Sequence, residues 1–285
     1  MKIIVAGAKG RLGSRVVEVL NAAAHSPIPT DLPELELTDF SAVRTFVGDH
    51  RPDAVIHCAA WTDVDGCARE PEKAVRINGL ATGTLASITG DLGIPMAYVS
   101  SNEVFDGTAG RAYLEYDPTR PINPYGYSKW VGEQALIRTN PRHWIMRTSW
   151  LFAHGGKNFI QSILNAAKAG KPLRVVVNEI ANPTYNDDLA EAIVNLIGVG
   201  RFGTYHLVNE GYCSRYAFAR YALDRAGYTD TLIQPISATE WQRPSIPPEF
   251  SPLVNLAAAE IGVQLRSWQQ AVDAFLEKEG LLKTL

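Results

Sequence analysis

Short apolar runs alternate with longer amphipathic stretches through the first half of the chain. The runs lie at residues 2–6, 53–58, 96–99 and 143–147, and each is mostly apolar. Runs of this kind are typical of parallel strands that are buried on both faces. The stretches between them, such as residues 16–20 and 70–92, carry helical patterns of apolar positions. This alternation predicts an α/β fold with a doubly wound parallel sheet.

A glycine-rich turn separates the first strand from the first helix. Gly7, Gly10 and Gly13 follow the spacing G-x-x-G-x-x-G. Such a turn lets the backbone approach a pyrophosphate at the positive N-terminus of a helix. Glycines also serve ordinary tight turns, but the strand before and the helix after favour a nucleotide-binding turn of the Rossmann type.

A second strand is expected at residues 26–30, although Pro27 and Pro29 weaken its strand character. Asp31 follows it at the position where an acidic residue contacts the adenosine ribose in dinucleotide-binding folds. Further on, Thr38 or Asp39 is the expected N-cap of a helix that runs through residues 43–47.

The regular alternation of predicted strands and helices ends after residue 150. A helix opening at 156–159, a strand at 172–177, a helix starting near 187, a strand at 205–208 and a terminal helix at 267–278 are expected there. We expect residues 1–150 to form a dinucleotide-binding domain, to which residues 178–210 return. Residues 151–285 are expected to form mainly a smaller, interleaved substrate-binding domain that closes over a ligand.

The stretch 123–129, Asn-Pro-Tyr-Gly-Tyr-Ser-Lys, is expected to open a helix with Pro124 in its first position. Tyr125 and Lys129 are then one turn apart and share a face. An ammonium beside a phenol is expected to lower the pKa of the phenol, so the pair could exchange a proton with a carbonyl oxygen. Taken alone, Y-x-x-x-K is more typical of an exposed helix face.

The composition of the chain argues against several classes of protein, such as nucleic-acid-binding, disulfide-rich and membrane proteins. The chain of 285 residues has 27 basic and 30 acidic side chains, a formal charge of −3, and no basic run that would favour nucleic acid. Cys58, Cys67 and Cys213 form no C-x-x-C pair, which argues against a zinc site or a disulfide framework and favours the cytoplasm. The first apolar run is too short for a signal segment, and no run reaches transmembrane length. No metal or membrane association is expected.

Several segments, in order along nearly the whole chain, resemble the extended short-chain dehydrogenase/reductase superfamily and, more closely, the dTDP-4-dehydrorhamnose reductase family. They include GAKGRLG, ELELTD, AAWTDVDGCARE, VSSNEVFDGT, NPYGYSKWVGE, NPTYNDDLA and LRSWQQAV. The resemblance implies reduction of the 4-keto group of a nucleotide-activated deoxysugar with NADPH or NADH, as in the synthesis of dTDP-L-rhamnose from dTDP-4-dehydro-L-rhamnose. It also leaves a homodimer as an oligomeric state to be tested.

The resemblance also implies roles for individual residues. Tyr125 would donate a proton to the C4 oxygen, Lys129 would hold the nicotinamide ribose, and Ser101 would hydrogen-bond the carbonyl and the phenol. The expected cofactor-binding residues, besides Tyr125 and Lys129, are Gly7, Gly10, Arg11, Leu12, Gly13, Asp39, Phe40, Ala60, Trp61 and Thr62. The expected substrate-binding residues are Ser101, Asn102, Glu103 and Trp150.

Two positions depart from the family pattern. Asn102 and Glu103 stand where the family has aspartate and then tyrosine, and Glu103 resembles the sugar-nucleotide 4,6-dehydratases instead. An amide does not ionise, so Asn102 cannot supply the acid that a dehydratase needs. The alternatives are therefore a sugar-nucleotide epimerase or dehydratase, or a non-catalytic protein such as the regulatory subunit of methionine adenosyltransferase. Arg11 would favour NADP, whereas Asp31 would favour NAD.

Overall fold

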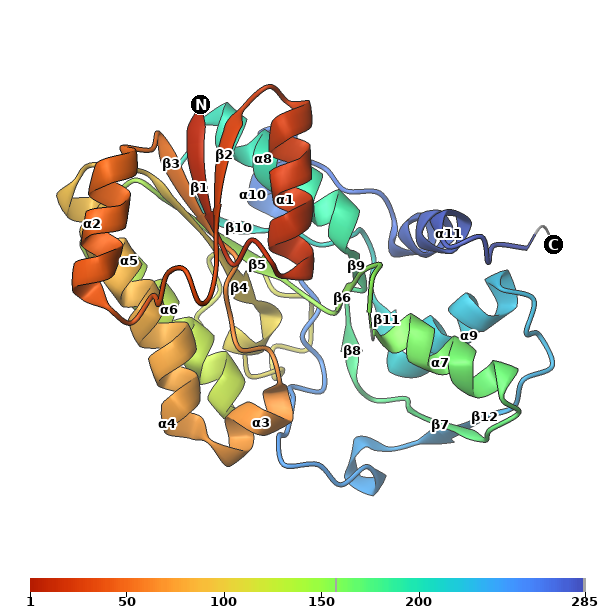
Figure 1. The fold of residues 1–285 in the computed structure, drawn as a ribbon. Helices are drawn as coiled ribbons and strands as arrows, with labels where there is room; N and C mark the ends of the chain where they lie inside the picture. The colour runs from red at the N-terminus through yellow and green to blue at the C-terminus, as the bar shows by residue number, and fades with distance from the viewer. Residues whose placement is uncertain (157, 284–285) are drawn as a thin grey trace.

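The computed structural model describes residues 1–156 and 158–283, and within them a six-stranded sheet has the strand order β10-β5-β4-β3-β1-β2 (Figure 1). Every neighbouring pair in it is parallel. The strands are β1 (Lys2–Ala6), β2 (Ser26–Thr30), β3 (Ala54–His57), β4 (Met96–Ser101), β5 (His143–Thr148) and β10 (Gly203–His206). The doubly wound α/β fold predicted from the sequence is confirmed.

Helices cover both faces of this sheet. One face carries α1 (Arg11–Ala22), α8 (Asn186–Val199) and α10 (Leu256–Glu260), and the other carries α2 (Phe40–His50), α5 (Ala81–Asp91) and α6 (Pro124–Thr139). Val16 of α1 and Ile193 of α8 are buried on one side, and Leu85 of α5 and Leu136 of α6 are buried on the other. Because both faces are covered, the strands read as continuous apolar runs.

Strand β2 forms at the predicted residues despite its two prolines. Ser26 N donates to Met1 O at 2.8 Å, and Thr30 O accepts from Gly7 N at 3.0 Å. Residues 26, 28 and 30 therefore direct their backbone groups toward β1. Pro27 and Pro29 face the open edge of the sheet, where a missing N–H breaks no ladder hydrogen bond.

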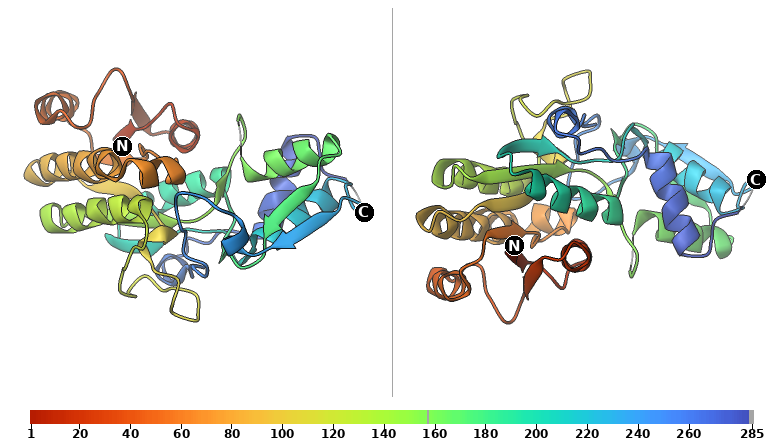
Figure 2. Two further views of the ribbon diagram at one scale, coloured as in Figure 1. Left: turned by 90° about the horizontal axis from the view of Figure 1, so that it is seen from below. Right: turned by 90° about the horizontal axis from the view of Figure 1, so that it is seen from above.

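A smaller unit lies to one side of the sheet in both views of Figure 2. It contains α7 (Phe159–Lys168), α9 (Arg215–Arg225) and α11 (Trp268–Lys278), with β7 (Leu173–Val176) parallel to β12 (Ile233–Ile236). Phe152, Phe218 and Phe275 are buried at its centre, in a core separate from those on the sheet. Of the helix opening expected at 156–159, Lys157 lies outside the described residues, and Asn158 is the N-cap of α7.

Short strand pairs connect the two units. Strand β6 (Leu151–Phe152) runs parallel to β9 (Thr184–Tyr185), and β8 (Ile180–Ala181) runs antiparallel to β11 (Cys213–Ser214). Helix α8 then packs on α1, and β10 joins the large sheet. Ala258, Val263 and Leu265 also belong to the core of the large sheet, so the chain passes between the units repeatedly.

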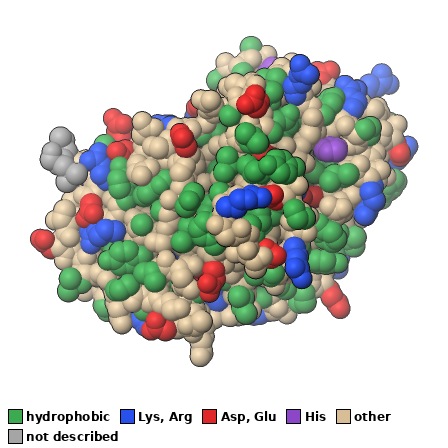
Figure 3. Space-filling view, turned by 180° about the vertical axis from the view of Figure 1, so that it is seen from behind, with side chains coloured by type: hydrophobic (Ala, Val, Ile, Leu, Met, Phe, Trp, Pro, Cys, Tyr) green, Lys and Arg blue, Asp and Glu red, His purple; other side chains and the backbone are tan. Residues whose placement is uncertain are grey.

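Shorter elements complete the path around the sheet. They are α3 (Val64–Arg69), α4 (Pro71–Ala74), a π-helical segment η1 (Val75–Leu80), and the 3-10 turns η2 (Asn102–Val104) and η3 (Ala238–Glu240). On the face shown in Figure 3, acidic and basic side chains are interspersed among hydrophobic ones. None of the described helices combines the length and apolar character needed to cross a membrane.

Candidate active site

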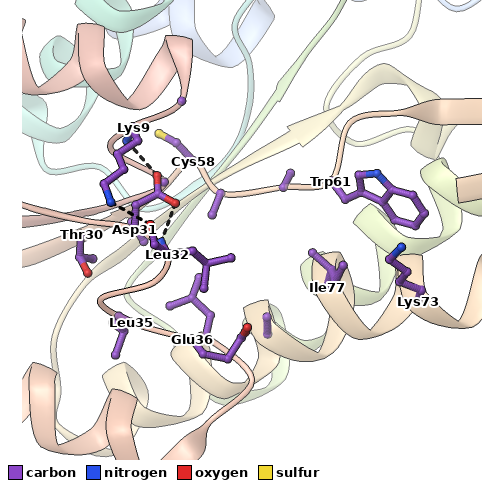
Figure 4. Close-up of a pocket in the computed structure, with 17 residues that line it drawn as sticks. Lys9, Thr30, Asp31, Leu32, Leu35, Glu36, Cys58, Trp61, Lys73 and Ile77 are labelled. Carbon is purple, nitrogen blue, oxygen red and sulfur yellow. Dashed lines mark hydrogen bonds between the residues drawn. The ribbon is translucent and has the colours of Figure 1, made fainter. Parts of the chain in front are cut away.

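A pocket of about 540 Å³ opens at the carboxyl ends of β1, β2 and β3. Its walls come from the segments 6–10, 30–37, 58–61 and 73–81. Figure 4 shows Lys9 and Asp31 at one end of this pocket and Trp61 beside Lys73 at the other. The ammonium of Lys73 lies 4.6 Å from the centre of the Trp61 ring.

The glycine turn has no room for side chains. Gly7 has φ 83°, and a Cβ there would lie 2.5 Å from the backbone nitrogen of Ala59. A Cβ on Gly13 would lie 2.1 Å from Gly7 O, so helix α1 packs directly against the turn. This bare backbone at the N-terminus of a helix fits the pyrophosphate of a dinucleotide.

The predicted cofactor residues divide into two groups by position. Gly7, Gly10, Ala60 and Trp61 line the pocket. The remaining ones are not among the described residues that line it, and these are Arg11, Leu12, Gly13, Asp39, Phe40, Thr62, Tyr125 and Lys129. The Asp39 carboxylate accepts a hydrogen bond from Ala42 N at 2.9 Å and is the N-cap of α2.

Asp31 and Lys9 lie at one end of the pocket (Figure 4). One carboxylate oxygen of Asp31 accepts from Lys9 N and the other from Leu32 N, each at 2.8 Å. The Lys9 ammonium bonds the Glu34 carboxylate at 2.8 Å, and this contact lowers the pKa of Glu34. Asp31 therefore lies at the end of β2, as predicted, with its charge uncompensated by the Lys9 ammonium.

Asn78 is a positioning residue to which the sequence interpretation assigned no role. It lies on the π-helical segment η1, a kind of turn that is frequent at functional sites. Its amide accepts from Trp61 N at 2.7 Å and donates to Trp61 O at 3.0 Å and Ser128 Oγ at 2.9 Å. Ser128 in turn donates to Tyr125 O at 2.7 Å. An asparagine within an otherwise apolar helical pattern was the available signal.

Tyr125, Lys129 and Ser101 meet beside the pocket. Pro124 is the first residue of α6, as predicted, and the N-cap Asn123 accepts from Gly126 N at 2.8 Å. The hydroxyl of Ser101, the last residue of β4, lies near the phenol of Tyr125 and acts to lower its pKa. Lys129 is only 3% exposed, and its ammonium lies 4.4 Å from the centre of the Tyr98 ring.

The prediction that Lys129 lowers the pKa of Tyr125 is wrong. Burial raises the pKa of the Tyr125 phenol well above its usual value, and the nearby Glu103 carboxylate raises it further. Burial also lowers the pKa of Lys129 to about 7, although the Glu133 carboxylate opposes this shift. Desolvation therefore determines both directions: it favours the neutral phenol of Tyr125, and it makes Lys129 lose its proton at a much lower pH than an exposed lysine would.

The two departures from the family pattern occupy different surroundings. The Glu103 carboxylate accepts from Asn123 Nδ2 at 2.7 Å, and burial raises its pKa against the opposing effects of Asn123, Arg243 and Arg215. Asn102 is buried, and its amide accepts from Ser101 Oγ at 3.3 Å and donates to Ser251 Oγ at 2.7 Å. Asn102 thus connects Ser101 to the segment that follows β12.

Trp150 lies at the junction between the two units. It adopts the left-handed backbone region with φ 41°, which is uncommon for a residue with a side chain. The guanidinium of Arg215 lies 3.5 Å from the centre of its ring. Trp150 therefore contacts Arg215 at the start of α9, and it is not among the described residues that line the pocket.

A parallel sheet with a dinucleotide pocket at its carboxyl edge, next to a serine, a tyrosine and a buried lysine, defines a nicotinamide-dependent short-chain dehydrogenase/reductase. The family model described as the RmlD substrate binding domain matches residues 1–280, and the chain belongs to that family.

Individual relatives agree with this assignment. The chain is 35% identical over 277 residues to the spore coat polysaccharide biosynthesis protein SpsK of Bacillus subtilis, covering 97% of each chain. It is 32% identical to a dTDP-4-dehydrorhamnose reductase of Streptomyces griseus, covering 94% of this chain and 91% of that one. A crystal structure of the Bacillus anthracis dTDP-4-dehydrorhamnose reductase in complex with NADP superimposes with a TM-score of 0.93 at 33% identity, covering 97% and 99% of the two chains. The resemblance inferred from the sequence motifs is confirmed.

Proposed function

We propose that this chain reduces the 4-keto group of a nucleotide-activated deoxysugar with NADPH or NADH, converting dTDP-4-dehydro-L-rhamnose to dTDP-L-rhamnose. The observation that carries the proposal is the pairing of Ser101 with Tyr125 beside a dinucleotide pocket. The full-length similarity to dTDP-4-dehydrorhamnose reductases supports the choice of substrate.

Side chains of this protein supply the proton that the C4 oxygen takes up during the reduction. The bound nicotinamide supplies a hydride to C4 of the sugar. Tyr125 is a neutral acid at physiological pH because burial raises its pKa, and its phenol donates the proton to the C4 oxygen. Ser101 donates a second hydrogen bond to that oxygen, where negative charge develops. Lys129, with a pKa near 7, holds the nicotinamide ribose and returns a proton toward Tyr125.

We assign roles in cofactor binding to the predicted residues that line the pocket. The backbone of Gly7 and Gly10 faces the pyrophosphate, and the loop at Ala60 and Trp61 runs along the nicotinamide half. Gly13 keeps α1 against the turn. For Asp39 the geometry supports helix capping in place of a direct contact with the adenine.

The two alternative functions receive less support. A dehydratase needs an acid beside Glu103, but the Asn102 amide is buried between Ser101 and Ser251. A purely regulatory protein has no need of Ser101, Tyr125 and a buried Lys129 in one place. A cytoplasmic location, supported by the three unpaired cysteines, and a homodimer remain predictions.

The test is to follow nicotinamide oxidation with dTDP-4-dehydro-L-rhamnose for the wild type and Tyr125→Phe. We expect the variant to lose about 100-fold or more in kcat, because the proton donor is removed. Tyr127→Phe is the matched control, since Tyr127 lies on the same helix and is 47% exposed. Equal rates for wild type and Tyr125→Phe would contradict the assigned role, and a wild type without turnover would contradict the function.

A further inference from the structure

Glu103 is a carboxylate beside the reacting groups that the proposed reduction does not use. It lies on η2, two residues after Ser101, and its backbone N donates to Ser101 Oγ at 3.2 Å. After burial, the charge of Glu103 is the next cause that raises the pKa of the Tyr125 phenol. The carboxylate is therefore a neighbour of both groups that bind the C4 oxygen in the proposed reduction.

The first turn of α6 positions the Glu103 side chain. Its Oε2 accepts from Asn123 Nδ2 at 2.7 Å, and Asn123 Oδ1 in turn accepts from Gly126 N at 2.8 Å. The same Asn123 amide also donates to Ile246 O at 3.2 Å. A Cβ on Gly126 would lie 3.3 Å from the Cβ of Glu103, so the side chain starts against this turn. The turn that carries the Tyr125 phenol therefore also holds the carboxylate.

The second carboxylate oxygen of Glu103 keeps its capacity to accept a proton. Within the part of the chain that the structure describes, Oε1 forms no hydrogen bond and Glu103 has no ion-pair partner. The two nearby arginines pair elsewhere: Arg243 Nε lies 3.0 Å from Asp65, and Arg215 Nε lies 3.6 Å from Glu179. A carboxylate that is held by one oxygen and unpaired at the other has the arrangement that a general base requires.

The surroundings of Glu103 also strengthen it as a base. Burial raises the pKa of its carboxyl, although the hydrogen bond from Asn123 and the charges of Arg243 and Arg215 oppose this shift. A carboxylate with a raised pKa takes up a proton more readily than one in water, and this brings its basicity closer to that required near neutral pH.

The chemistry of the proposed substrate provides a proton for such a base. A ketone at C4 makes the hydrogens on C3 and C5 acidic, because their removal leaves an enolate whose charge lies on the C4 oxygen. Tyr125 and Ser101 donate to that oxygen in the proposed reduction, and the same donors stabilise an enolate. A proton acceptor and donors for the developing negative charge therefore meet in one site.

We propose that Glu103 is a general base that removes a proton from a carbon next to the C4 carbonyl, so that this site catalyses reversible enolisation of the keto sugar in addition to its reduction. The inference rests on the proposed function for the identity of the ketone. It adds a second reaction at the same carbonyl.

The step balances without any change in oxidation state. The proton moves to Glu103, the electron pair of the C–H bond becomes the C=C bond of the enol, and the carbonyl pair moves to the C4 oxygen, which accepts from Tyr125. In reverse, Glu103 returns a proton to the same face of the sugar, so the configuration is retained. Loss of a hydroxyl does not follow, because the amide of Asn102 cannot protonate a leaving group.

The experiment follows the uptake of deuterium from D2O into dTDP-4-dehydro-L-rhamnose by proton NMR, with the full chain and no reduced cofactor. The NMR signals report C3 and C5 separately. We expect the wild type to exchange one of these positions about 100-fold or more faster than buffer, and Glu103→Gln to return to nearly the buffer rate. Glu103→Asp keeps the charge and should keep part of the exchange. Glu210→Gln, at an exposed glutamate, is the matched control and should exchange at the wild-type rate.

Exchange by the wild type at the buffer rate would overturn the proposal without reference to any variant, as would equal exchange by the wild type and Glu103→Gln. The affinity of Glu103→Gln for NADPH should stay at the wild-type value, and a parallel loss of affinity and exchange would show a structural role and also overturn the assignment. Reduction of the same ketone is measured separately. A chain that reduces the ketone without exchange contradicts this inference alone, and one that exchanges without reduction contradicts the proposed function alone.

Discussion

A Cβ on Gly126 would lie 2.0 Å from the carbonyl oxygen of Glu103. The first turn of α6 therefore rests directly on the backbone that follows β4. Tyr125 directly precedes Gly126, and Ser101 lies two residues before Glu103. The contact between Gly126 and Glu103 therefore keeps Tyr125 close to Ser101.

Gly126→Ala should separate these two segments. We expect the free energy of unfolding to fall by about 2 kcal/mol or more, because the added methyl group meets backbone and not a flexible side chain. Activity should fall more steeply than cofactor affinity, since the glycine turn is untouched. Gly48→Ala in α2, where a Cβ meets nothing within 4 Å, should leave the free energy of unfolding unchanged or slightly raise it. Equal stabilities by urea denaturation would contradict the expected clash.

Lys129→Met should make the protein more stable and less active. The pKa of Lys129 is about 7 in the folded chain against 10.5 as its ordinary value. Below pH 7 the folded chain carries the cost of a buried ammonium, and between pH 7 and 10.5 this cost disappears as the folded form loses its proton. We therefore expect the variant to gain about 2 kcal/mol in the free energy of unfolding at pH 6, after the lost contact with the Tyr98 ring is taken into account.

The measurement is urea denaturation at pH 6 and pH 9. The advantage of Lys129→Met over the wild type should shrink between the two values, because the wild type gains stability as the pH rises. Lys168→Met, at an exposed lysine, should show no such dependence. A variant less stable than the wild type at pH 6 would show that the contact with Tyr98 outweighs the burial of the charge.

Local rules were sufficient for much of the fold. The apolar runs predicted the strands, and the cap residues Asp39, Asn158 and Ser214 begin helices where side-chain chemistry indicates. Strand β2 formed despite Pro27 and Pro29, because an edge strand leaves alternate backbone groups unpaired. These features depend on neighbours in sequence.

The parts of the site that could not be predicted depend on contacts between distant segments. Asn102 and Ser251 are 149 positions apart, and Arg243 and Asp65 are 178 apart. The pKa of Tyr125 was expected to fall because Lys129 lies one turn away, but burial by the rest of the fold determines its direction. The motifs therefore indicate the residues of the site, while burial by the whole fold determines their protonation.

Asp31→Asn should shift cofactor preference toward NADPH. Asp31 lines the pocket at the end of β2, where we expect the adenosine ribose, and the Lys9 ammonium nearby is paired with Glu34. A 2′-phosphate is repelled by the Asp31 carboxylate, whereas a free 2′-hydroxyl can donate to it. We expect the ratio of kcat/KM for NADPH to that for NADH to rise by about 10-fold.

Asp53→Asn is a matched control for this variant. Asp53 also accepts a backbone hydrogen bond, from Lys2 N at 2.7 Å, but it precedes β3 and so lies at the opposite edge of the sheet. Asp53→Asn should leave the ratio of kcat/KM for NADPH to that for NADH unchanged. A ratio that stays the same in Asp31→Asn would show that another group, such as Arg11, controls the choice.

Glu103→Gln should move the alkaline limb of the pH profile. The Glu103 carboxylate raises the pKa of the Tyr125 phenol, so its removal lowers that pKa and the proton donor is lost at a lower pH. We expect kcat/KM to decline at a lower pH in the variant, while the hydrogen bond from Asn123 is kept by the glutamine oxygen. Glu210→Gln, at an exposed glutamate, should keep the wild-type profile. An alkaline limb that stays at the wild-type pH in Glu103→Gln would mean that Glu103 is already neutral in the active form, in agreement with the effect of burial on its own pKa.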